Sequence, residues 1–187
     1  MKDKLMPPII LTLICVIVSA LLVLAYNVTY VDTTGVMTDQ LKASSEEIFG
    51  KSDYEIITTK DSEGNKIVLT FGKVVNVIKD KKNSDRVILE VKTDGYAKDG
   101  IDILVGLDKD GKVQGISVVA LGETPGLGTK VNDKSYLEKF NGMNSSEDID
   151  GVDGISAATY SSNGIKSAIK EAVTQFEKNK EAIFNGK

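Results

Sequence analysis

Residues 87–120 read VILEVKTDGYAKDGIDILVGLDKDGKVQGISVVA, a stretch that contains three runs rich in Val and Ile. The runs are typical of β-strands and lie at 87–92, 101–107 and 113–120. Asp110-Gly111 supplies residues that tolerate positive φ, which favours a hairpin between the last two runs. Two further strand-like runs precede this stretch, at 54–58 and 66–78. The chain is therefore expected to build a sheet that contains a hairpin.

Apolar residues at helical spacing predict helices before and after these strands. One helix is expected over 35–50, with Gly50 as its stop. A short helix is expected from about residue 132 through Phe140, and a last one from about 162 to 183. Strands in the middle with helices around them indicate an α+β fold, in one domain of about 155 residues.

The composition excludes several classes of site. The chain has no His and one Cys, so it offers no Ser-His-Asp triad, no His-held metal and no Cys-held iron–sulfur cluster. Redox chemistry would need a cofactor that depends on few special side chains, a condition that flavin meets. With 23 basic and 27 acidic residues, the chain lacks the basic surface typical of nucleic-acid binding. We predict no metal site, no catalytic side chain and no nucleic-acid partner.

Residues 9–26, IILTLICVIVSALLVLAY, carry no charge. The run reaches the length of about 18 residues that is typical of a membrane-spanning helix. A cleaved signal peptide is the competing interpretation, but Leu24-Ala25-Tyr26 is a poor cleavage site. The sequence therefore predicts an uncleaved N-terminal transmembrane helix.

Charges on the two sides of this run predict its orientation. Lys2 and Lys4 precede it and Asp32 is the first charge after it, which favours a cytoplasmic N-terminus. Tyr26 and Tyr30 suit the outer interface of the membrane. The expected organisation is a cytoplasmic stub and transmembrane helix over 1–31, followed by a single extracytoplasmic domain over 32–187.

Residues 122–128, GETPGLG, form a loop by their chemistry. Pro125-Gly126 favours a type II turn, because Pro fixes φ at the first central position and Gly accepts positive φ at the second. The simplest interpretation is a tight connection between a strand and a helix. A functional interpretation adds that the glycines leave room for a flat ligand and that Leu127 covers an apolar ring.

Residues 153–161, DGISAATYS, place three Ser and Thr hydroxyls and two alanines directly before a helical pattern. Small residues allow close approach of the backbone, hydroxyls donate to oxygens, and a helix start favours an anion, so the stretch suits a phosphate. The alternative is a Ser-rich helix cap, for which Ser161 or Ser162 would serve.

The same stretch resembles the flavin attachment motif of the FMN-binding domain family. That motif has an acidic residue, Ser or Thr, Gly or Ala, Ala, Thr, any residue, and Ser or Thr, and its places are filled by Asp153, Ser156, Ala157, Ala158, Thr159 and Ser161. The resemblance implies FMN held by a phosphoester bond to Thr159. Ala157 stands where Gly is commoner. Ala is suitable at this position unless the backbone there needs a positive φ.

The resemblance extends over about 87–175, because residues 95–108, 110–113 and 123–128 look like the core of this domain in the same order. It implies that one loop lies beside the isoalloxazine ring, through Glu123, Thr124, Gly126, Leu127 and Gly128. Two roles are open for Glu123: bonding the flavin, or holding the turn.

With one predicted anchor, this length and this domain, the chain resembles the G subunit of the Rnf complex. That complex is a membrane ferredoxin:NAD oxidoreductase that moves Na⁺ or H⁺. The resemblance implies an electron-transfer subunit with covalent FMN in the cell membrane, other membrane subunits as partners, and a flavin transferase for maturation. Alternatives are a subunit of a Na⁺-translocating NADH:quinone reductase, a stand-alone extracytoplasmic flavin reductase, and a membrane-anchored adapter or ligand-binding module without redox function.

Overall fold

The computed structural model divides the chain into two compact units, Met1–Thr33 and Thr34–Lys187. It describes residues 2–29 and 34–185. Tyr30 and Asp32, which contributed to the predicted topology, lie outside the described residues.

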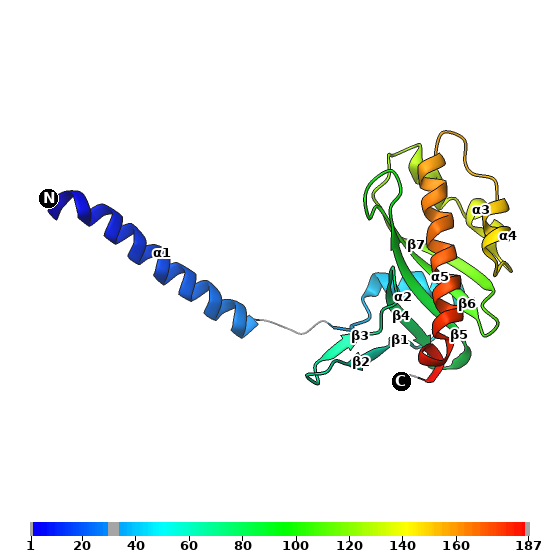
Figure 1. The fold of residues 1–187 in the computed structure, drawn as a ribbon, viewed down its shortest axis with the longest axis horizontal. Helices are drawn as coiled ribbons and strands as arrows, with labels where there is room; N and C mark the ends of the chain where they lie inside the picture. Colours follow the sequence, from blue (N-terminus) through cyan, green and yellow to red (C-terminus); the bar gives the residue numbers. More distant parts are fainter. Residues whose placement is uncertain (1, 30–33, 186–187) are drawn as a thin grey trace. The chain divides into compact units, whose positions relative to one another are not determined.

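The first unit contains one long helix, α1 (Lys2–Thr29), drawn in blue in Figure 1. Large apolar side chains along it are exposed, and so is the thiol-bearing Cys15. By the joint criterion of length and hydropathy, no helix among the described residues qualifies as one that could cross a membrane. The predicted transmembrane helix is therefore not confirmed.

The second unit is built on a five-stranded antiparallel sheet in the order β1-β4-β5-β6-β7. Its strands are β1 (Tyr54–Ile56), β4 (Val74–Asp80), β5 (Asn83–Thr93), β6 (Ile101–Asp108) and β7 (Val113–Leu121). The predicted hairpin is confirmed, since β6 pairs with β7 and Leu107 lies opposite Val113. The amide of Gly111 donates to the carbonyl of Asp108 at 3.0 Å and closes the turn between them.

Two of the predicted strands are each divided in the structure. The run at 54–58 separates into β1 and β2 (Thr58–Lys60), and the run at 66–78 separates into β3 (Lys66–Val68) and β4. β2 and β3 form a small sheet of their own. A turn in which the amides of Phe71 and Val74 donate to each other's carbonyls breaks the second run. Val and Ile content indicates extended chain, but it does not reveal such turns.

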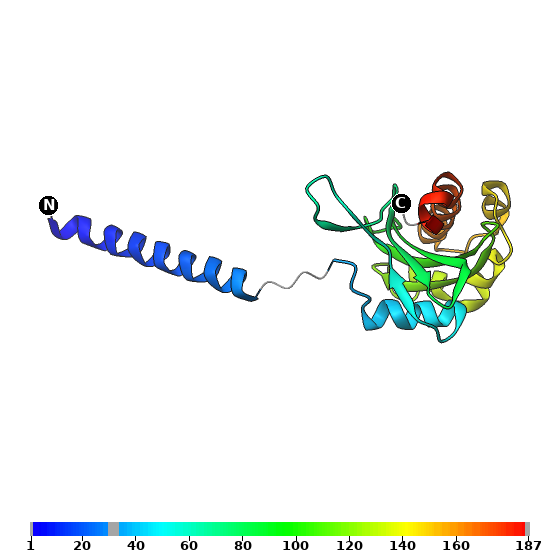
Figure 2. The ribbon, with the colours of Figure 1, turned by 90° about the horizontal axis from the view of Figure 1, so that it is seen from below.

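Two helices cover opposite faces of the large sheet, α2 (Asp39–Phe49) and α5 (Thr159–Asn185) (Figure 2). Between β7 and α5 lie shorter helices: η1 (Gly128–Asn132), α3 (Lys134–Leu137), η2 (Glu138–Phe140) and α4 (Ser146–Gly151). The combination of helices with an antiparallel sheet confirms the predicted α+β class. Helix α4 was not predicted, and α5 begins three residues before the expected position of 162.

Side chains of β6 point alternately to the two faces of the sheet, which explains why helices pack on both faces. Ile101, Ile103 and Val105 join the core on the α5 side, where Ile165 and Phe176 are buried. Leu104 joins a second cluster that includes Leu41 of α2. Each fully buried Ile or Phe contributes about 1.5–3 kcal/mol. The apolar stripe of α5 therefore fixes that helix, and with it the position of its first turn.

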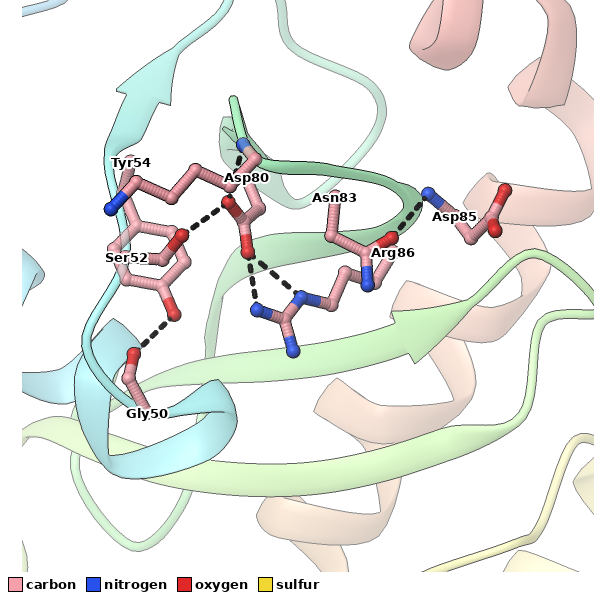
Figure 3. Close-up of polar contacts among 8 residues, drawn as sticks. Gly50, Ser52, Tyr54, Asp80, Asn83, Asp85 and Arg86 are labelled. Carbon is pink, nitrogen blue, oxygen red and sulfur yellow. Dashed lines mark hydrogen bonds and ion pairs between the residues drawn. The ribbon is translucent and has the colours of Figure 1, made fainter.

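An ion pair between the buried Asp80 of β4 and the partly buried Arg86 of β5 lies near the end of α2 (Figure 3). Asp80 accepts hydrogen bonds from Nε of Arg86 at 2.8 Å and from the hydroxyl of Ser52 at 2.5 Å. The guanidinium of Arg86 also lies 4.6 Å from the ring centroid of Phe49 in α2. Burial alone raises the pKa of Asp80, but hydrogen bonds from Ser52, Arg86 and the amide of Lys82 outweigh it, so the pKa lies below its usual value.

Two buried carboxyl groups lie on neighbouring strands of the sheet, Glu90 on β5 and Asp102 on β6. Glu90 accepts a hydrogen bond from the amide of Asn76 at 2.6 Å, and Asp102 pairs with Lys92 at 3.2 Å. Oδ1 of Asp102 is buried and has no hydrogen-bond partner. Burial raises the pKa of Glu90, and the charge of Asp102 adds to the increase. The native state therefore binds a proton at this pair more tightly than the unfolded chain does.

Glu90→Gln should change how stability depends on pH. A carboxyl whose pKa is raised in the folded state loses its contribution to stability as the pH rises from the unfolded value towards the folded one. The glutamine amide is neutral and can donate to Asp102, so the variant should exceed the parent in free energy of unfolding at neutral pH. The difference should shrink as the pH falls below the unfolded pKa. Urea unfolding across this pH range measures it.

The control for this experiment is Glu177→Gln on the exposed surface of α5, which should follow the parental pH dependence. If Glu90→Gln also follows the parent, or is less stable at neutral pH, the pair does not hold a proton in the native state.

Candidate functional site

The two sequence motifs meet at one cavity of about 320 Å³. It lies where α5 begins, at the upper end of this helix in Figure 1. Its walls come from the loop after β5, the loop after β7, the end of the loop before α5 and the first turn of α5. They are formed by Tyr96, Glu123, Thr124, Leu127, Gly128, Ala157, Ala158, Thr159, Tyr160 and Ser161. The volume falls at the lower end of the range for small-molecule pockets, about 300–1,000 Å³.

Eight of the eleven predicted site residues line this cavity. Asp153, Ser156 and Gly126 are exposed and are not part of its walls. Two other hollows, of about 170 Å³ beside β7 and about 520 Å³ beside α4, include no predicted site residue. Chain segments that are far apart in sequence thus converge at the cavity that the motifs predict.

Thr159 is the first residue of α5, and its side chain is exposed beside the cavity. The amides of the first helical turn have no acceptor within the helix, and the positive end of the helix dipole lies there. The hydroxyl of Thr159 is therefore placed where a phosphate group would be stabilised.

The interpretation of Ser161 or Ser162 as the helix cap is wrong. Both residues lie inside the first turn of α5 and are buried. Ser162 already donates its amide to the carbonyl of Ala158 at 2.8 Å, while its hydroxyl accepts from the amide of Ile155 at 2.9 Å. The second of these bonds holds the loop before α5 against the helix.

Ala157 has a φ of 66°, in the left-handed region. The chain turns there to enter α5, and the amide of Ala158 donates to the carbonyl of Ile155 at 3.0 Å. A residue with a Cβ atom in this conformation costs about 1–2 kcal/mol. The condition under which Ala would be a poor substitute for Gly is therefore met, and the site contains a strained residue close to the hydroxyl of Thr159.

Ala157→Gly should stabilise the protein by about 0.5–1 kcal/mol, because relief of the left-handed strain exceeds the extra flexibility that Gly gives the unfolded chain. The free energy of unfolding in urea measures the change. Ala158→Gly is the matched control: Ala158 is buried and has no positive φ, so this variant should be less stable than the parent. A destabilised Ala157→Gly would contradict the assignment of strain.

Glu123 is 5% exposed, and the protein itself occupies both of its carboxylate oxygens. The amide of Tyr96 lies 3.0 Å from each oxygen, and the amide of Ala97 donates to Oε1 at 3.3 Å. The hydroxyl of Ser161 donates to Oε2. One side chain therefore ties the loop after β5 and the start of α5 to the loop after β7, a geometry that favours the turn-holding role.

The loop over residues 124–127 adopts the predicted type II turn. Gly126 has a φ of 75°, as the Pro-Gly pair predicts, and the amide of Leu127 donates to the carbonyl of Thr124 at 3.2 Å. The amide of Gly126 donates to the hydroxyl of Thr129 at 2.9 Å, so it is engaged within the loop. Leu127 is presented to the cavity with about half of its side chain exposed.

Sequence reasoning missed two cavity residues, Tyr96 and Tyr160. Tyr160 occupies the place of the motif where any residue is accepted, and Tyr96 lies in a loop between two strands. Neither position follows a periodic pattern, so local sequence gave no indication of their proximity.

Residues 95–174 match the model of the FMN-binding domain family. The match begins in the loop after β5 and ends within α5, so it includes every segment that lines the cavity. This region of the chain is therefore similar to an FMN-binding domain.

Relatives of this chain are, by name, parts of ion-translocating oxidoreductase complexes. The G subunit of the ion-translocating oxidoreductase complex of Shewanella piezotolerans is 30% identical over 119 residues, which cover 56% of this chain and 56% of that protein. The G subunit of the Na⁺-translocating ferredoxin:NAD⁺ oxidoreductase complex of Acetobacterium woodii is 27% identical over 191 residues, which cover 89% of this chain and 90% of that protein. The match thus spans about half of the first relative and most of the second.

One solved structure, the C subunit of the Na⁺-translocating NADH-quinone reductase of Parabacteroides distasonis, matches 75% of this chain and 67% of that chain. The sequence identity is 20% and the TM-score is 0.43.

Proposed function

We propose that this protein is the electron-transferring G subunit of an Rnf-type, ion-translocating ferredoxin:NAD oxidoreductase complex, with FMN bound covalently to Thr159. The observation that carries the proposal is the cavity in which the 123–128 loop and the 157–161 segment meet inside the region that matches the FMN-binding domain. A relative of similar length that bears the name of the G subunit supports the choice of complex.

The residues around the cavity fit FMN. Thr159 at the start of α5 would hold the phosphate through its hydroxyl, and the first-turn amides would stabilise the negative charge. Ala157, Ala158 and Gly128 line the cavity, and their small or absent side chains leave room for a ligand against the backbone. Leu127 offers an apolar contact for the ring. When bound, FMN supplies one-electron transfer, and the protein supplies its position and its surroundings.

The proposed partners are the other membrane subunits of the complex and a flavin transferase that forms the phosphoester bond. In this arrangement, residues 32–187 form an extracytoplasmic FMN-binding domain. A covalent bond has a physical purpose outside the membrane, because a lost FMN could not be replaced there from the cytosol.

The proposal includes a single N-terminal membrane anchor with a cytoplasmic N-terminus. No described helix qualifies as a span by length and hydropathy, so the support comes from other features. Residues 9–26 carry no charge, and the large apolar side chains of α1 are exposed. An exposed apolar surface of this kind is stabilised by lipid or by other membrane helices.

Thr159→Val should abolish covalent FMN while preserving the fold, since it removes the hydroxyl and keeps the shape of an exposed side chain. The parent, produced together with a flavin transferase, should give a fluorescent band on a denaturing gel under ultraviolet light, and the variant should give none. Intact-mass analysis should show the matching loss of one FMN group.

Thr124→Val is the matched control, because Thr124 also lines the cavity but lies outside the attachment motif. It should keep the fluorescent band, and Thr159→Ser should keep at least part of it. A band that persists in Thr159→Val would place the bond on another residue.

The topology can be tested with a thiol reagent that does not cross membranes. In a Cys15→Ser background, Ser62→Cys would place one thiol at the exposed turn between β2 and β3. This thiol should react in intact cells from which the outer barrier has been removed. Labelling that occurs only after lysis would reverse the proposed orientation.

A further inference from the structure

Five large apolar side chains are exposed in the described part of the second unit: Val36, Ile67, Tyr96, Leu127 and Tyr160. Three of these line the same cavity, with exposed fractions of 74% for Tyr96, 47% for Leu127 and 71% for Tyr160. Single exposed apolar residues are common on protein surfaces, but a cluster around a cavity indicates a binding surface. The cluster therefore points to an apolar ligand or ligand part at this cavity.

The positions of the two tyrosines are fixed by the protein, although their rings are exposed. Both carboxylate oxygens of Glu123 lie 3.0 Å from the amide of Tyr96. Ser161, the neighbour of Tyr160, donates its hydroxyl to the same carboxylate. The two rings meet edge to face, with centroids 6.3 Å apart and an angle of 71° between their planes. One buried acid thus anchors the backbone beside both rings.

Tyrosine suits a place where a flat aromatic ligand is covered on one side and water remains on the other. Its ring contributes apolar contact with little loss of side-chain freedom, while its hydroxyl keeps its hydrogen bonds to water. Tyr160 directly follows the residue that would carry the phosphate of FMN. A ring system attached through Thr159 is therefore restricted to the neighbourhood of these side chains.

We propose that Tyr96 and Tyr160 are positioning residues that contact the isoalloxazine ring of FMN bound at Thr159. The assignment rests on the proposed function and adds the residues that set the surroundings of the ring. These contacts reduce the exposure of the ring to water and restrict its movement about the bond to Thr159.

Flavin fluorescence tests this contact directly. A phenol ring in contact with the excited isoalloxazine donates an electron to it and takes the electron back without emission of light, so the fluorescence is quenched. In protein carrying covalent FMN, Tyr96→Leu and Tyr160→Leu should each raise the fluorescence per bound FMN and shift the flavin absorption band, and the variant with both changes should raise the fluorescence several-fold. Ile67→Ala, which changes an exposed apolar residue outside the cavity, should change neither property.

Tyr96→Phe and Tyr160→Phe keep the ring and remove only the hydroxyl, so they should fold even if the leucine variants do not. Phenylalanine is harder to oxidise than tyrosine, so these variants should show higher fluorescence with the parental absorption band. Parental fluorescence in both phenylalanine variants, or in FMN-loaded leucine variants, would overturn the assignment. A rise at one tyrosine alone would overturn it for the other. A parent that takes up no FMN would instead overturn the proposed function together with the assignment.

Discussion

The carboxylate of Glu123 is the contact on which the site depends. It accepts hydrogen bonds from the loop after β5 and from the start of α5, while its own backbone belongs to the loop after β7. A buried carboxylate is stable only when its oxygens accept hydrogen bonds. Removal of one donor leaves a buried charge that lacks part of its hydrogen bonding, which is unfavourable. Three segments that share no local sequence are therefore held in one geometry by a single side chain.

Glu123 can make these contacts only because the core brings α5 close to the loop after β5. The buried stripe of α5 packs on β5 and β6, which fixes the helix on the sheet. At Gly164 a Cβ atom would lie 2.6 Å from the carbonyl oxygen of Asp94 and 2.4 Å from the side chain of Ile101. The absence of a side chain at this position therefore permits the close approach of the helix. The packing of α5 on the sheet therefore determines the geometry of the site.

Strain is concentrated where the chain enters α5. Ala157 is one of two described non-glycine residues with a positive φ, and it lies two residues before Thr159. Such a conformation persists when neighbouring contacts determine it, and here the contacts are the bonds that hold Ile155 to Ala158 and to Ser162. The turn leads directly into α5, whose first residue, Thr159, lines the cavity. The strained turn therefore helps to expose the proposed attachment residue.

The sequence by itself determined the features that arise from neighbouring residues. Turn chemistry predicted the hairpin between β6 and β7 and the positive φ of Gly126, and the two motifs indicated most of the cavity. Tertiary structure alone decided which segments meet. It started α5 at Thr159, divided the runs at 54–58 and 66–78, gave Glu123 its partners and placed Tyr96 beside Tyr160. Local patterns report backbone preference and burial, whereas these contacts join residues up to 64 positions apart and depend on how helices and sheet pack.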